Sequence, residues 1–154
     1  AMAPICQPAA RVFFYGMTPA HRRGHMARAV LEGCAFAMRD VVERLDQMGV
    51  DARSLLLVGG GAHSRLWARM RADIVQRPVQ LPNCIDCAPI GRALLAAVAG
   101  GAAHDLAEAV GALSDGHTDI EPDRRQADAY DAAHDRYRQL FGALRPLFTE
   151  QPRN

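Results

Sequence analysis

The sequence has little of several features that mark specialised classes of protein. Its 154 residues include only four cysteines, and its formal net charge is +1. So few cysteines in a chain this rich in aliphatic residues exclude a disulfide-stabilised scaffold. The balanced charge gives no electrostatic basis for binding nucleic acid or an anionic membrane, and no apolar run approaches the roughly 20 residues needed to span a bilayer. We therefore expect neither a nucleic-acid partner nor a membrane partner.

The first ten residues, AMAPICQPAA, also lack the basic region and apolar core of a secretory signal peptide. This indicates a cytoplasmic protein, and its length is enough for one domain with a hydrophobic core. We expect residues 1–10 to form an N-terminal tail, residues 11–148 to form the domain, and residues 149–154 to form a C-terminal tail.

Short apolar runs and helical periodicities alternate through the first two thirds of the chain. The apolar runs predict three strands, at Arg11–Met17, Ser54–Val58 and Arg77–Pro82. Apolar residues three or four positions apart predict three helices, at Gly24–Met48, Ser64–Gln76 and Ala88–Gly100. Thr18 and Pro19 are typical of residues that begin a helix. The alternation indicates an α/β fold with parallel strands and packed helices.

The last third of the chain carries weaker signals. It predicts a short helix at Ala103–Val110, a polar loop at Ser114–Asp123 and then an amphipathic helix. The apolar side of that C-terminal helix is formed by Tyr130, Tyr137, Leu140, Phe141 and Leu144.

Three consecutive glycines, Gly59–Gly61, lie between the predicted strand at Ser54–Val58 and the predicted helix at Ser64–Gln76. Glycine adopts positive φ angles and lets a ligand approach the backbone without meeting a Cβ atom. Backbone N–H groups at a helix N-terminus suit a phosphate, so this loop is typical of a nucleotide site. The alternative is a tight strand-to-helix turn that binds no ligand.

Two common nucleotide motifs do not fit these glycines. A P-loop requires a Lys-Ser or Lys-Thr pair after its last glycine, and none follows here. A dinucleotide fingerprint requires glycine or alanine where this chain has Ser64, and an acidic residue where it has Leu81–Asn83. A dinucleotide-dependent oxidoreductase is therefore the weakest of the functional alternatives.

Two segments carry a resemblance to a known family. LLLVGGGAHSRLWARMRADIVQRPVQLPNCIDCAPIGRALLAAVAGG and FFYGMTPAHRRGHMARAVLEGCAFAMRD resemble the C-terminal domain of the FGGY carbohydrate kinases, within them most closely the xylulokinases. The match departs from the family signature at Val12, directly before the second segment, where a small residue is usual, and within that segment at His21–His25. The resemblance covers Arg11–Gly101 and continues loosely into the C-terminal helix.

The resemblance implies a partial actin-like ATPase (ribonuclease H-like) fold and the ATP-binding portion of a pentulose kinase, which transfers the γ-phosphate of ATP to a sugar hydroxyl. Its cofactors would be ATP and the Mg²⁺ that accompanies the nucleotide. Carried over from the family, the nucleotide-binding residues would be Gly59, Gly60, Gly61, Ala62, Ser64 and Arg65. Neither a catalytic residue nor a metal ligand is assigned.

Kinases of this family are about three times longer, and their sugar-binding domain and catalytic Asp have no counterpart here. We therefore expect this chain to be inactive alone and to meet sugar only together with an N-terminal domain. A strand at Val12–Tyr15 would lack its sheet neighbour, which favours a homo-oligomer or a complementing N-terminal polypeptide. The alternative function is a non-catalytic nucleotide-binding or assembly module.

Several other residues admit both a functional and a structural interpretation. Cys84 and Cys87 form a single C-x-x-C pair, and a metal or redox role for one isolated pair is the weaker interpretation. His21 and His25 lack a third ligand nearby, so capping or interface roles are favoured. We expect Trp67 to be a core residue.

Overall fold

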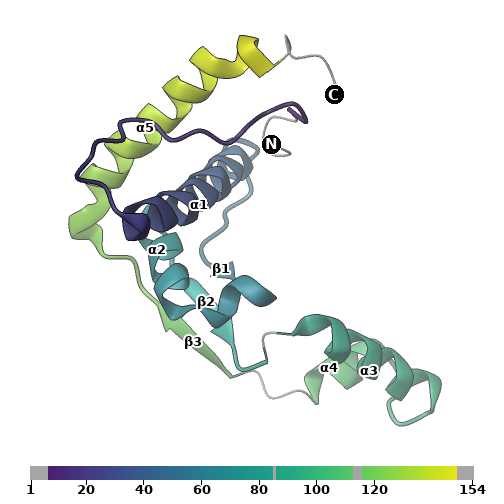
Figure 1. Cartoon of the computed structure of the whole chain (residues 1–154). Coiled ribbons are helices and arrows are strands. Elements are labelled where there is room, and N and C mark those ends of the chain that lie inside the picture. The colour runs from purple at the N-terminus through teal and green to yellow at the C-terminus, as the bar shows by residue number, and fades with distance from the viewer. Residues whose placement is uncertain (1–6, 85, 113–115, 149–154) are drawn as a thin grey trace.

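The computed structural model describes residues 7–84, 86–112 and 116–148, and the statements below concern that part of the chain. Its α-helices are α1 (Arg23–Gln47), α2 (Arg65–Val75), α3 (Cys87–Ala99), α4 (Leu106–Gly111) and α5 (Ala127–Leu144). Its strands are β1 (Leu55–Leu56), β2 (Val79–Pro82) and β3 (His117–Ile120), and its 3-10 helices are η1 (Gly60–His63), η2 (Arg124–Gln126) and η3 (Arg145–Phe148). Figure 1 shows their arrangement.

The strands form one small sheet in the order β1-β2-β3. β1 pairs with β2 in parallel, with Leu55 opposite Val79, and β2 pairs with β3 antiparallel, with Val79 opposite Ile120. The parallel pair confirms the predicted strand–helix–strand unit around α2. The prediction of a loop over Ser114–Asp123 is wrong for β3, because three of its four side chains are exposed and polar and so give no strand pattern.

The long predicted helices are confirmed, but the beginning of the chain differs from prediction. Residues 11–17 form no strand, and Val12 is 85% exposed. An extended segment needs a neighbouring strand to satisfy its backbone, and the described residues offer it none. Thr18 does not cap α1 either. Its carbonyl accepts from the His21 N–H at 3.0 Å, and the N-cap of α1 is Arg22, four residues later.

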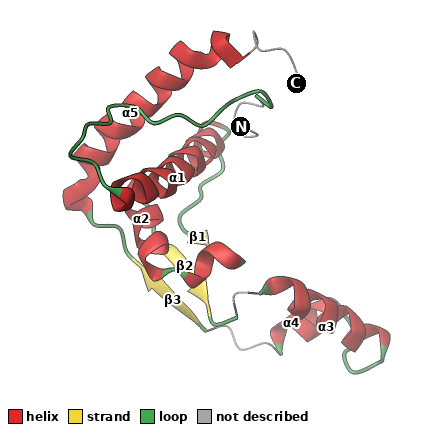
Figure 2. Cartoon of the chain, in the orientation of Figure 1, coloured by secondary structure: helices red, strands yellow, loops and turns green. Residues whose placement is uncertain are grey.

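Helix α2 lies at the centre of the molecule and buries both of its sides. On one side it packs on the sheet in a cluster of Leu57, Ala62, Ala68, Ala72, Val79 and Leu81. On the other side it packs against α1 and α5 in a cluster of Ala35, Phe36, Met70, Ile74 and Tyr130. Figure 2 shows α1 and α2 between the sheet and α5. Two-sided burial fixes α2 firmly, and with it the loop that precedes it.

Helices α3 and α4 lie beside each other and apart from the other helices (Figure 1). The residues of α3 are half-buried or exposed although most of them are apolar, and Leu95 is among the exposed ones. Within the described residues, no helix is both long enough and apolar enough to cross a membrane.

Candidate functional site: the glycine loop

The loop between β1 and α2 is a compact turn built on backbone hydrogen bonds. The Leu57 N–H donates to the Gln80 carbonyl at 2.9 Å, which holds the end of β1 on β2. Gly59 then turns the chain with φ +76°, a region that side chains rarely allow. The Ala62 N–H donates back to the Gly59 carbonyl at 2.9 Å and closes the first turn of η1.

The three glycines occupy three different environments. Gly59 requires its positive φ, and a Cβ atom there would meet nothing within 4 Å. Gly60 has no such φ, and a Cβ atom there would also meet nothing within 4 Å. At Gly61 a Cβ atom would lie 2.9 Å from Cζ3 of Trp67 and 3.0 Å from Nη2 of Arg71. Only Gly60 is exposed, so it is the glycine at which an outside group can reach the backbone.

The other predicted site residues divide between the core and the surface. Ala62 is buried in the sheet-side cluster, so its side chain is not available to a ligand. Ser64 is the N-cap of α2, and its hydroxyl accepts from the Trp67 N–H at 3.3 Å. Arg65 and His63 are exposed beside it. The loop therefore presents Gly60, the Ser64 hydroxyl and Arg65 at the beginning of a helix, where the partial positive charge of the helix favours an anion.

Two side chains of α2 pack behind the loop. The indole N–H of Trp67 donates to the Leu31 carbonyl of α1 at 3.4 Å, and the Arg71 guanidinium lies 3.7 Å from the centre of the indole ring. Burial lowers the pKa of Arg71, opposed by the electrostatic influence of Cys34. Trp67 is half-buried and packs on the α1–α5 side, so its predicted structural role is confirmed. The sequence did not predict a role for Arg71, because an arginine within a predicted helix forms no recognisable motif.

A second polar cluster joins α1 to α5. His134 is 2% exposed, and its Nε2 lies 3.0 Å from Asp40 Oδ1. Ligand atoms of Asp40, Glu43 and His134 lie within 4.8 Å of one another, a spacing that a metal ion would accept. Arg138 already neutralises both carboxylates, since its Nε donates to Asp40 at 2.7 Å and its Nη2 lies 2.9 Å from Glu43. We therefore assign this cluster to a structural ion-pair network.

The rings of His21 and His25 lie edge to face with centroids 5.5 Å apart, but within the described residues no third ligand joins them. The His25 Nδ1 accepts from the Arg22 N–H at 3.0 Å at the beginning of α1, whereas the His21 Nδ1 accepts from the Thr18 N–H at 3.0 Å in the turn before the helix. Cys84 and Cys87 are free and exposed, and Cys87 is the first residue of α3.

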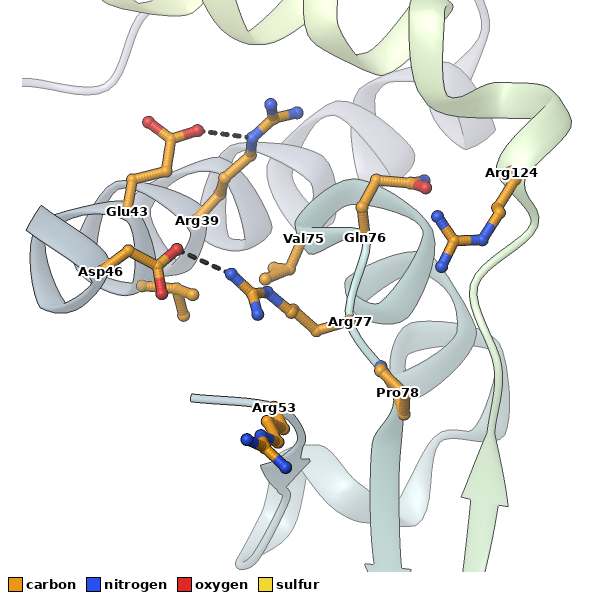
Figure 3. Close-up of a pocket in the computed structure, with 10 residues that line it drawn as sticks. Arg39, Glu43, Asp46, Arg53, Val75, Gln76, Arg77, Pro78 and Arg124 are labelled. Carbon is orange, nitrogen blue, oxygen red and sulfur yellow. Dashed lines mark hydrogen bonds and ion pairs between the residues drawn. The ribbon is translucent and has the colours of Figure 1, made fainter. Parts of the chain in front are cut away.

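A cavity of about 480 Å³ lies at the other end of α2 from the glycine loop. Figure 3 shows it between the last turns of α1 and the turn that leads from α2 to β2. Three of its four arginines are neutralised by ion pairs: Arg39 with Glu43, Arg77 with Asp46, and Arg53 with Asp51. We assign it no ligand, and the glycine loop remains the candidate site.

Comparison with known proteins defines the family and the fold class of this chain. The family model described as "FGGY family of carbohydrate kinases, C-terminal domain" matches residues 1–100. The chain therefore belongs to the FGGY family of carbohydrate kinases, and the resemblance seen in its sequence is confirmed. The fold prediction is confirmed as well, because solved structures of FGGY sugar kinases, which have the actin-like ATPase fold, superpose on the chain.

Within the family, the chain is similar to xylulose kinases. The xylulose kinase of Escherichia coli (strain K12) is 33% identical over 145 residues, which cover 94% of this chain and 30% of that protein. The L-xylulose/3-keto-L-gulonate kinase of the same strain is 33% identical over 85% of this chain and 26% of its own length. The crystal structure of xylulose kinase from Rhodospirillum rubrum superposes with a TM-score of 0.72 and 35% identity, over 90% of this chain and 28% of that one. The chain thus spans about 30% of the relatives it matches.

Proposed function

We propose that this chain is the ATP-binding portion of a sugar kinase and that the glycine loop holds the nucleotide. The observation that carries the proposal is Gly60, which is exposed and open on the side where a Cβ atom would stand, beside the first turn of α2. A backbone without a side chain at a helix N-terminus binds phosphate through N–H groups. Family membership independently supports nucleotide use, because kinases transfer phosphate from a nucleotide.

The proposed contacts differ in kind along the loop. Gly59 shapes the turn, Gly60 brings its bare backbone toward the nucleotide, and Gly61 packs the loop against Trp67 and Arg71. The Ser64 hydroxyl retains a proton to donate while it accepts from Trp67, and the Arg65 guanidinium offers charge to a phosphate or a flat face to the base. Ala62 contributes through its backbone alone. We propose that Mg²⁺ arrives bound to the phosphates, since a nucleotide-bound Mg²⁺ keeps most of its ligands as water and phosphate oxygen.

We propose that phosphoryl transfer requires the segments of the relatives that this chain does not cover. Transfer depends on holding acceptor, metal and γ-phosphate together, and the loop provides at most the nucleotide side. Xylulose or a similar pentulose is the proposed acceptor, because the matched relatives act on xylulose by name. The proposed compartment is the cytoplasm, where ATP is supplied.

Titration calorimetry with Mg-ATP tests the nucleotide site, with NAD as the control ligand. We expect binding of Mg-ATP and none of NAD. Gly60→Val should abolish that binding, because it fills the open side of the loop, while the thermal midpoint stays close to that of the original chain. Gly142→Ala is the matched control, since Gly142 is also exposed with nothing within 4 Å of a Cβ atom, but lies in α5. Equal affinity of the Gly60→Val variant would refute the loop as the site.

A second experiment separates the kinase from the alternative of a non-catalytic module. The chain is combined with a polypeptide that corresponds to the first two thirds of a xylulose kinase, and sugar-dependent ATP hydrolysis is measured. Hydrolysis that needs both polypeptides supports a kinase portion with a complementing partner. Nucleotide binding without any restored hydrolysis supports the module, and sedimentation of the chain alone tests the homo-oligomer prediction.

A further inference from the structure

Gly61 stands out from the other two glycines because the space beside it is filled. The atoms that fill it belong to the ring of Trp67 and the guanidinium of Arg71, at 2.9 Å and 3.0 Å from the position of a Cβ atom. A Cβ atom closer than 3.0 Å to a neighbour forces that neighbour to shift, which the flexible end of Arg71 can do more readily than the Trp67 ring. Gly61 is therefore needed for packing against these two side chains, whatever the loop binds.

We propose that Arg71 is a positioning residue for the nucleotide loop: stacked on Trp67, it forms a buttress against Gly61 that fixes the loop conformation. The effect of Arg71 on nucleotide affinity rests on the proposed function above, whereas its effect on the conformation of the loop does not. We call Trp67, Arg71 and the backbone of Gly61 the loop buttress.

The buttress is anchored to the body of the protein. The Trp67 indole N–H donates to the Leu31 carbonyl at 3.4 Å, so the ring is tied to α1 as well as to its own helix. The ring also packs against the cluster between α1, α2 and α5. The ring and the guanidinium together fill the space on the side of Gly61 where a Cβ atom would stand. The loop is thus packed against two side chains of α2, one of which is hydrogen-bonded to α1, in addition to its own backbone bonds.

The charge of Arg71 gives an independent reason to assign it a role. Among the described arginines that are not exposed, Arg39 and Arg77 each have a carboxylate partner. Arg71 has no carboxylate partner within the described residues: its guanidinium lies 3.7 Å from the centre of the Trp67 ring, and Cys34 is its other electrostatic partner. A partly desolvated cation over an indole face is stabilised by the ring quadrupole, and a planar guanidinium stacks in a way that an ammonium does not. The pairing therefore selects arginine at this position.

Trp67 is the single tryptophan of the chain, so its fluorescence reports the buttress directly. The experiment compares the original chain with two variants. Arg71→Met keeps a long side chain that can pack but removes the charge, and Arg71→Lys keeps the charge but replaces the planar guanidinium by an ammonium. Arg136→Met is the matched control, since Arg136 is exposed on α5 and has no recorded partner among the described residues. The readouts are acrylamide quenching of Trp67 and hydrogen exchange of the amides at 59–64, with those of α5 as the internal reference.

We expect Arg71→Met to increase quenching and to speed exchange of the loop amides roughly two- to fivefold, the range expected for a partly exposed cation–π contact. Exchange in α5 should stay unchanged. Quenching and loop exchange in Arg71→Lys should lie between those of the original chain and those of Arg71→Met, and Arg136→Met should match the original chain. Gly61→Ala should disturb the loop more than Gly60→Ala does. Unchanged quenching and loop exchange in Arg71→Met would overturn the proposal, as would equal acceleration in α5, which would show a general loss of stability.

Nucleotide titration of the same variants separates this inference from the proposed function. If the original chain binds Mg-ATP, Arg71→Met should weaken binding by a similar factor, and unaltered affinity alongside a loosened loop would refute the positioning role. If the original chain binds no Mg-ATP, the proposed function fails, and quenching and exchange still decide whether the buttress fixes the loop.

Discussion

Removing the Asp40 carboxylate should destabilise the chain strongly, because it is the shared acceptor of a buried network. Asp40 Oδ1 accepts from Arg138 Nε at 2.7 Å and lies 3.0 Å from His134 Nε2. The hydrogen bond to Asp40 is also the main reason that the pKa of Arg138 is raised. The His134 ring stacks on Phe36 and Tyr137, with centroids 5.7 Å and 6.1 Å away, so it cannot turn to water when its partner is lost.

The expected loss of unfolding free energy follows from the bonds that Asp40 makes to Arg138 and His134. Hydrogen bonds to a charged acceptor contribute about 1.5–3 kcal/mol each, and breaking a buried ion pair costs about 3–5 kcal/mol. Arg138 is 47% exposed at its side chain and keeps its contact with Glu43, so water offsets part of its loss. We therefore expect Asp40→Ala to lower the free energy of unfolding by about 3 kcal/mol, which corresponds to roughly 6–12 °C in the thermal midpoint of a domain this size.

Urea unfolding followed by circular dichroism at pH 7 measures this change. Asp51→Ala is the matched control, because the Asp51–Arg53 pair is as short, at 2.7 Å, but 60% and 87% exposed. Exposed pairs contribute about 0–1 kcal/mol, so the control should change little. A loss below about 1 kcal/mol in Asp40→Ala, or equal losses in both variants, would show that the network does not hold α5 on α1.

Two further predictions concern caps and turns. Ser64→Ala should cost about 1 kcal/mol of unfolding free energy, because it removes the N-cap acceptor of α2, and urea unfolding should show no comparable loss for Ser54→Ala. The pKa of Asp123 is held well below its usual range, chiefly by its hydrogen bonds from Arg125. Because the pKa of Asp123 is depressed in the folded state, its contribution to stability is fully present above the unfolded pKa of about 3.9. That contribution is lost as the pH falls from this value through the folded pKa. Carboxyl NMR should therefore find Asp123 still ionised at pH 3 in the original chain. In Arg125→Ala it should titrate at a higher pH, although the bonds from the backbone N–H of residue 125 and from Gln126 remain, and the same midpoint in both chains would contradict this.

The sequence predicted the elements whose partners are close in the chain. Helices α1, α2 and α5 carry their own apolar periodicity, and the β1–α2–β2 unit is signalled by a run of leucines, three glycines and a proline-bounded strand. Elements that depend on distant partners were missed. β3 is a polar edge strand defined by pairing with β2, and the apolar segment at 11–17 forms no strand because the described chain places no neighbour beside it.

The same distinction applies to the candidate site. The glycines predict a loop with bare backbone, and the family resemblance adds the residues around it. Neither predicts which glycine forms the turn, which one is open to solvent and which one is packed. That division depends on Trp67 and Arg71, which lie six and ten positions after Gly61 and reach it only because α2 turns them back toward the loop. A side chain of a helix covers the turn before it, so a loop at a helix N-terminus is shaped by residues in the first two turns of the helix. The identity of a glycine motif is therefore readable from the sequence, whereas its rigidity is a property of the helix that follows.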